Sequence, residues 1–172
     1  MNLFSPGILK FLTVILVAGM WSCNQSFAPT DLASEPLIPL PVSVTSDGNL
    51  FQLRHDMDIY IQADHPAVAE AGQYLVSILR PATGFDLEIK PTPIAPSKGH
   101  IYMHLDSTQS DLGAEGYVLD ISDSGIELRA VKPAGLIMGI ATLRQLLPAD
   151  IESQTIRDID WLIPTGTIRY YP

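Results

Sequence analysis

Two histidine-containing stretches carry side chains of the types that bind metal ions. The first runs from His55 to Asp58 (HDMD), and the second places His100 and His104 four residues apart. On a strand, successive side chains point to opposite faces, so His55 and Asp56 would not converge on one ion. Four strand residues separate His100 from His104 by about 13 Å, which is too far for one ion without other ligands. We therefore predict no metal site and no cofactor.

Glu115, which stands directly before Gly116, is the acid that the pattern singles out as a candidate catalytic group. Hydrolysis of glycosidic or peptide bonds usually needs a second group held in position. The pattern assigns no partner to Glu115, which favours a turn or strand-entry role. None of the serines stands in a nucleophile elbow, and no glycine-rich phosphate loop is present. The sequence therefore predicts no catalytic residue in this chain.

Composition and charge limit the kinds of partner. The chain has 172 residues and a net charge of −9, with 10 Lys and Arg against 19 Asp and Glu. This balance argues against a nucleic-acid partner, because phosphate binding needs clustered basic side chains. Hydrophobic residues make up 47% of the chain, enough to fill the core of one domain. The single cysteine excludes an intrachain disulfide and a zinc site with several cysteines.

The first 22 residues have the pattern of a secretory signal. Lys10 supplies a positive charge, and the apolar run FLTVILVAGM that follows it is about half of the roughly 20 residues needed to span a bilayer. Cys23 comes next after a small residue, so the arrangement resembles a bacterial lipoprotein signal with Cys23 as the lipidated residue. The alternative is a plain secretory signal with a chance cysteine. We expect residues 1–22 to be the signal, residues 23–36 to be a flexible tether, and the protein to be exported to the periplasm or cell surface, touching the membrane only through its lipid.

Two segments have the spacing of amphipathic helices. The first begins at Pro66, and we expect Pro81 and Gly84 to end it. The second begins at Pro133 and is stopped by Pro148. Each carries apolar residues on one face, so both helices are expected to pack against the same core.

Two glycines lie on one side of the second helix, because Gly135 and Gly139 are four residues apart. Each costs roughly 1 kcal/mol of helix propensity relative to alanine, which indicates close packing against a neighbour. Arg144 on the same helix pairs with an acid or with a neighbouring domain, and a solvated or locally paired arginine is an equal alternative. We take Gly135, Gly139 and Arg144 as a domain-packing motif.

The rest of the chain alternates apolar and polar residues, as half-buried strands do. Residues 117–121 and 126–131 flank a short polar turn and predict a hairpin. Further strands are expected at residues 51–53, 57–61, 85–89 and 101–105, with a proline-rich surface loop at residues 90–98. The predicted fold is α+β, a mixed β-sheet with two amphipathic helices packed on one face.

The segment from Glu115 to Pro148 resembles a known family. It contains a Glu-Gly-Tyr strand entry, a turn with Gly125, and the helix AGLIMGIATLRQLLP, which carries the two glycines and the arginine named above. These features resemble the second half of the N-terminal, non-catalytic domain of β-N-acetylhexosaminidases of glycoside hydrolase family 20. Residues 38–41 (IPLP) resemble the family's opening I-P-x-P, and the end of the chain is similar to the linker into the family's catalytic barrel.

The resemblance implies an auxiliary domain at residues 37–160 and the start of a linker at residues 161–172. In the family, a following (β/α)8 barrel holds an adjacent Asp-Glu pair. The Glu protonates the leaving oxygen, the substrate's acetamido oxygen attacks the anomeric carbon, and the Asp orients the acetamido group. A barrel needs about 200 residues, so we expect this chain to stop before it and to be inactive alone. Its partners would be the barrel and, through the barrel, a glycan.

Two other functions stay open at this level. Related N-terminal domains precede barrels in α-glucuronidases and O-GlcNAc hydrolases, so the sugar could differ. A stand-alone lipoprotein module that binds a glycan or a protein is the alternative of a different class. A glycan-binding module should display exposed aromatic side chains, and the candidates are Tyr60, Tyr74, Tyr102 and Tyr117.

Overall fold

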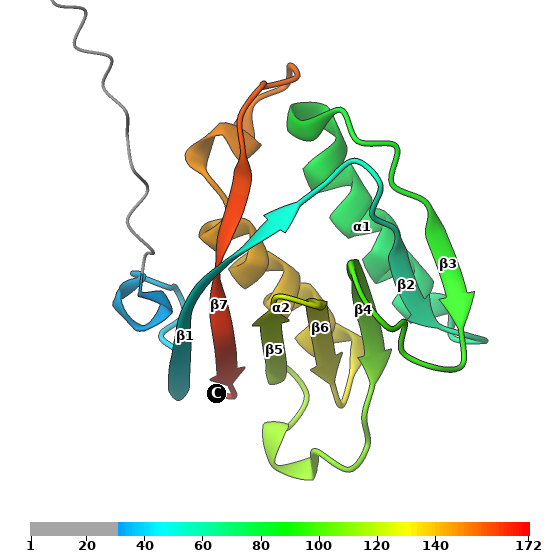
Figure 1. Cartoon of the computed structure of the whole chain (residues 1–172). Coiled ribbons are helices and arrows are strands. Elements are labelled where there is room, and N and C mark those ends of the chain that lie inside the picture. Colours follow the sequence, from blue (N-terminus) through cyan, green and yellow to red (C-terminus); the bar gives the residue numbers. More distant parts are fainter. Residues whose placement is uncertain (1–30) are drawn as a thin grey trace, which may run out of the picture.

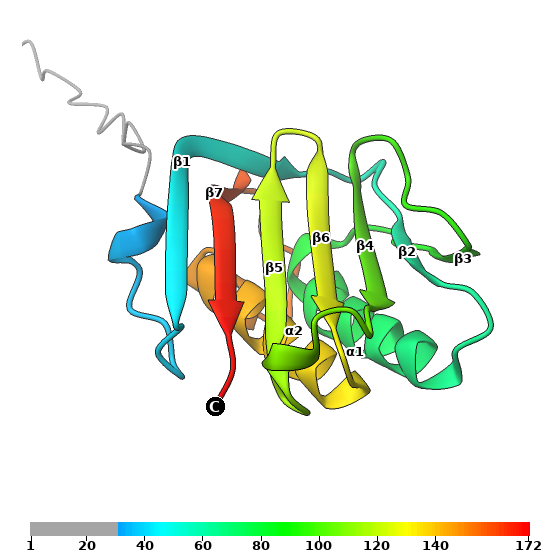
Figure 2. The same cartoon turned by 90° about the horizontal axis from the view of Figure 1, so that it is seen from below.

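The computed structural model describes residues 31–172, which form one mixed β-sheet with two helices on the same face (Figures 1 and 2). The predicted α+β fold is confirmed. In chain order the elements are η1 (Leu32–Ser34), β1 (Ser43–Leu53), β2 (Ile59–Gln62), α1 (Pro66–Thr83), β3 (Ile89–Thr92), β4 (His100–Leu105), η2 (Ser110–Leu112), β5 (Tyr117–Ser122), β6 (Gly125–Ala130), α2 (Pro133–Leu146), η3 (Ala149–Glu152) and β7 (Trp161–Tyr170).

The sheet has the strand order β1-β7-β5-β6-β4-β2-β3. Strands β3, β2, β4 and β6 run parallel, whereas β5, β7 and β1 are joined by antiparallel pairings. The predicted hairpin is confirmed, since β5 and β6 pair from Tyr117 opposite Ala130 to Ser122 opposite Gly125. The first and last strands of the chain are thus neighbours at one edge of the sheet, where β7 lies between β1 and β5.

Helix α1 begins at Pro66 as predicted but continues through Pro81. Proline removes one helical N–H, and this loss is tolerated in the last turn because the helix has only two more residues to run. Gly84 ends the helix in the left-handed conformation, with φ of 69°, and its N–H bonds to the carbonyl of Arg80. None of the helices within residues 31–172 is both long enough and apolar enough to cross a membrane.

The prediction of a strand over residues 85–89 is wrong except at its last residue. The strand β3 covers Ile89–Thr92 and includes Pro91, which the sequence pattern had placed in a loop. Proline is tolerated there because β3 is an edge strand that pairs only with β2, so its missing N–H takes no bond from the sheet.

Both predicted boundaries of the domain are corrected. Leu32, placed in the tether by its polar neighbours, is fully buried in the core cluster and lies where a side chain on Gly166 would be. The segment Trp161–Tyr170, predicted to begin a linker, is strand β7 and pairs with β1 and β5. Burial of apolar side chains on strands far apart in sequence decides both boundaries, and local composition does not report it.

The core lies between the sheet and the two helices. The predicted apolar stripe of α2 is buried, as is that of α1 apart from a partly buried Ile78. A buried hydrogen bond of 2.6 Å joins the hydroxyls of Tyr117 on β5 and Thr142 on α2. Burial raises the pKa of the Tyr117 phenol, so the group stays neutral and serves as a structural link.

Candidate functional site

The two glycines of α2 face the chain's own sheet. A Cβ atom on Gly135 would lie 2.2 Å from the carbonyl oxygen of Gly116, and one on Gly139 would lie 2.2 Å from Cδ1 of Leu128. Only glycine lets the helix lie this close to the sheet. This is the close packing that the low helix propensity of the two glycines predicted. The neighbour is the sheet of the same domain, so this pair sets the distance between helix and sheet.

Arg144 lies on the exposed side of α2 and pairs with an acid. Its guanidinium holds both carboxylate oxygens of Glu152, with Nε donating to Oε1 at 2.7 Å. This bond raises the pKa of Arg144 and lowers that of Glu152. Within the described residues, Arg144 therefore ties α2 to η3. Its partner is only eight residues further along the chain, so the contact fits both pairing with an acid and the alternative of a locally paired arginine.

The two histidine-containing stretches do not converge on a common point. Asp56 pairs with Arg54 at 3.0 Å, while Asp58 pairs with Lys90 at 2.6 Å. The ring Nδ1 of His100 accepts the N–H of Asp58 at 3.3 Å, whereas His104 faces another strand. Among residues 31–172, no group of three or more His, Cys, Asp or Glu is placed to hold a metal ion.

The remaining sequence candidates are scattered. Glu115 is exposed in the turn before β5, and Tyr117 is buried beneath α2. Tyr74 is exposed on α1, on the helical side of the molecule. Only Tyr60 and Tyr102 come together, because they stand opposite each other on β2 and β4. Cys23 lies outside the described residues, so its lipidation stays a prediction.

A chain of polar side chains crosses the face of the sheet opposite α1 and α2, which we call the open face. Nε2 of His104 lies 2.8 Å from Oε1 of Glu127. Arg129 reaches Glu127 at 3.4 Å and Asp120 at 2.6 Å. Thr167 donates to Asp120 at 2.5 Å. The alternation of polar residues along β4, β5 and β6 is the sequence signal for this face, but it does not reveal which strands are neighbours.

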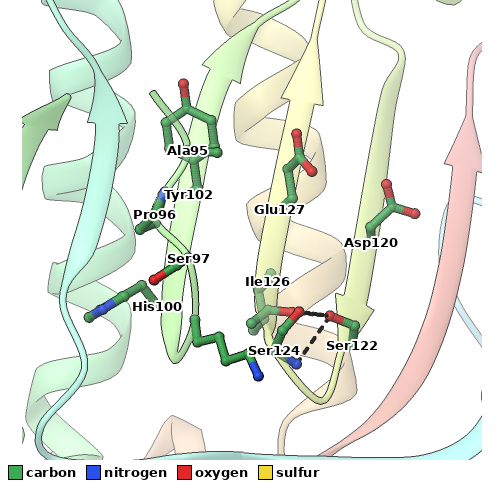
Figure 3. Close-up of a pocket in the computed structure, with 12 residues that line it drawn as sticks. Ala95, Pro96, Ser97, His100, Tyr102, Asp120, Ser122, Ser124, Ile126 and Glu127 are labelled. Atoms are coloured by element: carbon green, nitrogen blue, oxygen red, sulfur yellow. Dashed lines mark hydrogen bonds between the residues drawn. The ribbon is translucent and has the colours of Figure 1, made fainter. Parts of the chain in front are cut away.

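A pocket of about 130 Å³ opens on this face beneath the loop at residues 95–98 (Figure 3). Tyr102, Glu127 and Asp120 project into it side by side from β4, β6 and β5, as the strand register requires. Burial, and then the carboxylate of Glu127, raise the pKa of the Tyr102 phenol, so its hydroxyl is a neutral donor and acceptor. We call this cavity the sheet pocket.

The two carboxylates of the sheet pocket are not arranged as a catalytic pair. Arg129 lies between Asp120 and Glu127 and forms ion pairs with both, at 2.6 and 3.4 Å. A general acid or base has to be placed to exchange a proton with the substrate, whereas both of these carboxylates face the guanidinium of Arg129. The pocket is therefore arranged to bind a ligand through hydrogen bonds.

Exposed apolar side chains lie on the segment before β1 and directly after β7. They are Ile38, Leu40, Val42 and Tyr171, of which Leu40 is 83% exposed. Val42 donates its N–H to the carbonyl of Arg169, so the segment before β1 runs along the end of β7. The side chain of Gln145 on α2 clamps Ile38 through bonds of 3.0 and 2.9 Å to its N–H and carbonyl. We call these four residues the C-terminal apolar strip.

Comparison with known proteins gives consistent matches. The model of the family described as glycosyl hydrolase family 20, domain 2, matches residues 34–169. A β-hexosaminidase of Porphyromonas gingivalis is 29% identical over 136 residues, which cover 79% of this chain and 17% of the relative. The N-acetyl-β-hexosaminidase of Streptomyces plicatus, solved with thio-NAglucal, has a TM-score of 0.74 and 35% identity. The β-N-acetylhexosaminidase of Streptomyces coelicolor A3(2) has a TM-score of 0.74 and 36% identity.

The matched region is a small part of each relative. Both Streptomyces matches cover 84% of this chain but only 27% of the solved chain. The chain therefore spans less than a third of the length of the proteins that it resembles.

Proposed function

We propose that this chain, which belongs to the family described as glycosyl hydrolase family 20, domain 2, is the auxiliary N-terminal domain of an exo-β-N-acetylhexosaminidase. In this proposal a following (β/α)8 barrel removes terminal N-acetylhexosamine residues, and the present chain stabilises that barrel. The hexosaminidase names of the relatives favour this sugar over those of α-glucuronidases or O-GlcNAc hydrolases.

The observation that carries the proposal is the position of the C-terminal apolar strip. Its residues are exposed; Val42 lies beside the end of β7, and Tyr171 directly follows that strand. Exposed apolar clusters on soluble domains commonly mark surfaces that a partner covers. A barrel joined directly after Tyr171 would reach this strip first, and covering Leu40 and Val42 would remove their side chains from water.

An activity measurement tests the enzyme assignment. We expect the 172-residue chain to release no p-nitrophenol from p-nitrophenyl N-acetyl-β-glucosaminide, and the protein translated from the reading frame extended past codon 172 to release it. A stop codon directly after Pro172, or an extended protein inactive on this substrate but active on a glucuronide, would contradict the assignment.

The docking role is tested in the extended protein by Leu40→Ser, with Ile94→Ser as the control. Both residues are highly exposed in the present chain, but Ile94 lies in the loop before β4, away from the strip. We expect Leu40→Ser to lower the temperature at which activity is lost and Ile94→Ser to leave it unchanged. Equal effects of the two variants would contradict docking at this strip.

Export and anchoring form a second part of the proposal. Cys23 would carry a lipid and hold the domain near a membrane outside the cytoplasm. Labelling of expressing cells with radioactive palmitate, with Cys23→Ser as the control, should give a labelled band that the variant loses. An unlabelled wild-type chain would leave the plain secretory signal as the explanation.

A further inference from the structure

We propose that the sheet pocket binds a neutral sugar residue, independently of the chain's role beside a barrel. The pocket lies on the open face of the sheet, opposite both helices (Figures 2 and 3). Nothing in the proposed docking at the C-terminal apolar strip involves it. The result of the enzyme assay therefore does not decide this inference, which has a separate measurement of its own.

Two aromatic side chains of β4, His100 and Tyr102, line the pocket. The ring of Tyr102 stacks on that of His104 with centroids 4.8 Å apart, and the ring of His100 meets that of Tyr60 edge to face at 4.7 Å. The electron-rich faces of aromatic rings attract the positively polarised C–H groups of a sugar ring. The two lining rings are therefore suited to the apolar side of a sugar, although Tyr102 is only 9% exposed and offers a small contact.

The polar side of the pocket offers donors and acceptors together. Lys98 and Tyr102 line the pocket and bring an ammonium group and a phenol hydroxyl to it. Asp120 and Glu127 provide carboxylate oxygens with lone pairs left over after bonding to Arg129. A sugar hydroxyl donates and accepts at once, so it satisfies both kinds of group.

The charges at the pocket argue for a neutral ligand. The carboxylates of Asp120 and Glu127 are matched by two cationic side chains, Lys98 in the pocket wall and Arg129, which pairs with both acids. With the two signs balanced, the pocket offers no net charge that would attract an anion, a metal ion or an organic cation. A neutral polyhydroxy ring needs only the hydrogen-bonding groups that these side chains supply.

The size of the pocket limits how much of a glycan it can hold. Its volume of about 130 Å³ is well below the roughly 300–1,000 Å³ of sites for drug-sized ligands. One sugar residue is therefore the unit that fits, with the rest of a glycan outside. Affinity from so few contacts is expected to be weak, on the order of millimolar.

The test is an NMR titration of the whole 172-residue chain with N-acetylglucosamine, with glycerol as the matched polyol. We expect saturable amide shifts at residues 95–104 and 120–127, and none of them with glycerol. Tyr102→Phe removes one hydroxyl while keeping the ring, and should weaken binding about tenfold. Tyr74→Phe, the same change on α1, should leave binding unaltered.

Three results of the titration with the wild-type chain would overturn the inference. These are the absence of saturable shifts, shifts that glycerol reproduces, and shifts confined to the helical side. Equal binding by the Tyr102→Phe and Tyr74→Phe variants would overturn it as well. If Tyr102→Phe does not fold, Lys98→Ser in the exposed loop replaces it, and unchanged binding in that variant counts against the proposal.

Discussion

Replacing Gly139 with alanine tests the close packing of α2 on the sheet. Alanine gains roughly 1 kcal/mol of helix propensity. Its Cβ, however, would lie 2.2 Å from Cδ1 of Leu128, and the other two nearest atoms, at 3.1 and 3.2 Å, belong to the same side chain. Leu128 is buried in the core and cannot turn aside without displacing neighbours. Overpacking of this kind costs about 1–3 kcal/mol.

The two effects oppose each other, and the approach to 2.2 Å places the clash in the upper part of its range. We expect Gly139→Ala to lower the free energy of unfolding by up to about 2 kcal/mol after the propensity gain. For a domain of this size the melting temperature should fall by up to about 8 °C. Urea and thermal unfolding followed by circular dichroism measure both quantities, and Ala134→Gly at an exposed position of α2 sets the scale of the propensity effect.

A double-mutant cycle with Leu128→Ala separates the clash from other causes. This second change removes all three atoms that Gly139→Ala would meet, at its own cost of about 2–5 kcal/mol. In that background Gly139→Ala should stabilise the chain by up to about 1 kcal/mol, so its effect changes sign. The reasoning is refuted if Gly139→Ala is stabilising in the wild-type chain, or if the two changes add. No such rescue exists at Gly135, where the obstacle is a backbone carbonyl.

Two further predictions follow from contacts in the structure. Tyr117→Phe leaves the buried hydroxyl of Thr142 without its partner and should lower the free energy of unfolding in urea by about 1–2 kcal/mol. This would be contradicted if the double variant with Thr142→Val lost as much stability as the two single variants summed. Arg144 lowers the pKa of Glu152 in the folded chain. The contribution of this ion pair to folding stability is therefore complete near neutral pH, above the pKa of Glu152 in the unfolded chain. It is lost as the pH falls through the lower pKa of the folded state. Because the pair is exposed, that contribution is below about 1 kcal/mol. Glu152→Gln should therefore make the fall in the free energy of unfolding between pH 7 and pH 3 slightly shallower. The same dependence of stability on pH in the variant and the wild-type chain would contradict this.

Local patterns in the sequence already determined several elements. The hairpin of β5 and β6, the start of each helix at a proline, and the buried stripe of α2 all depend on neighbours within a few residues. The glycine spacing on α2 indicated a close contact, because a helix interior accepts such residues only at a cost in stability. The motif of that helix also pointed to the family that the comparisons identify.

Only the tertiary structure decided which distant segments meet. The sequence of β7 looked like a linker, because the strand is buried by pairing with β1, more than a hundred residues away. Leu32 looked like part of a tether, because its burial depends on a close approach to Gly166. The sheet pocket shows the same limit. Tyr102, Glu127 and Asp120 lie on three strands, and only the strand order and register bring their side chains together. Alternation within a strand fixes which residues share a face, but pairing between strands fixes which residues are neighbours on it.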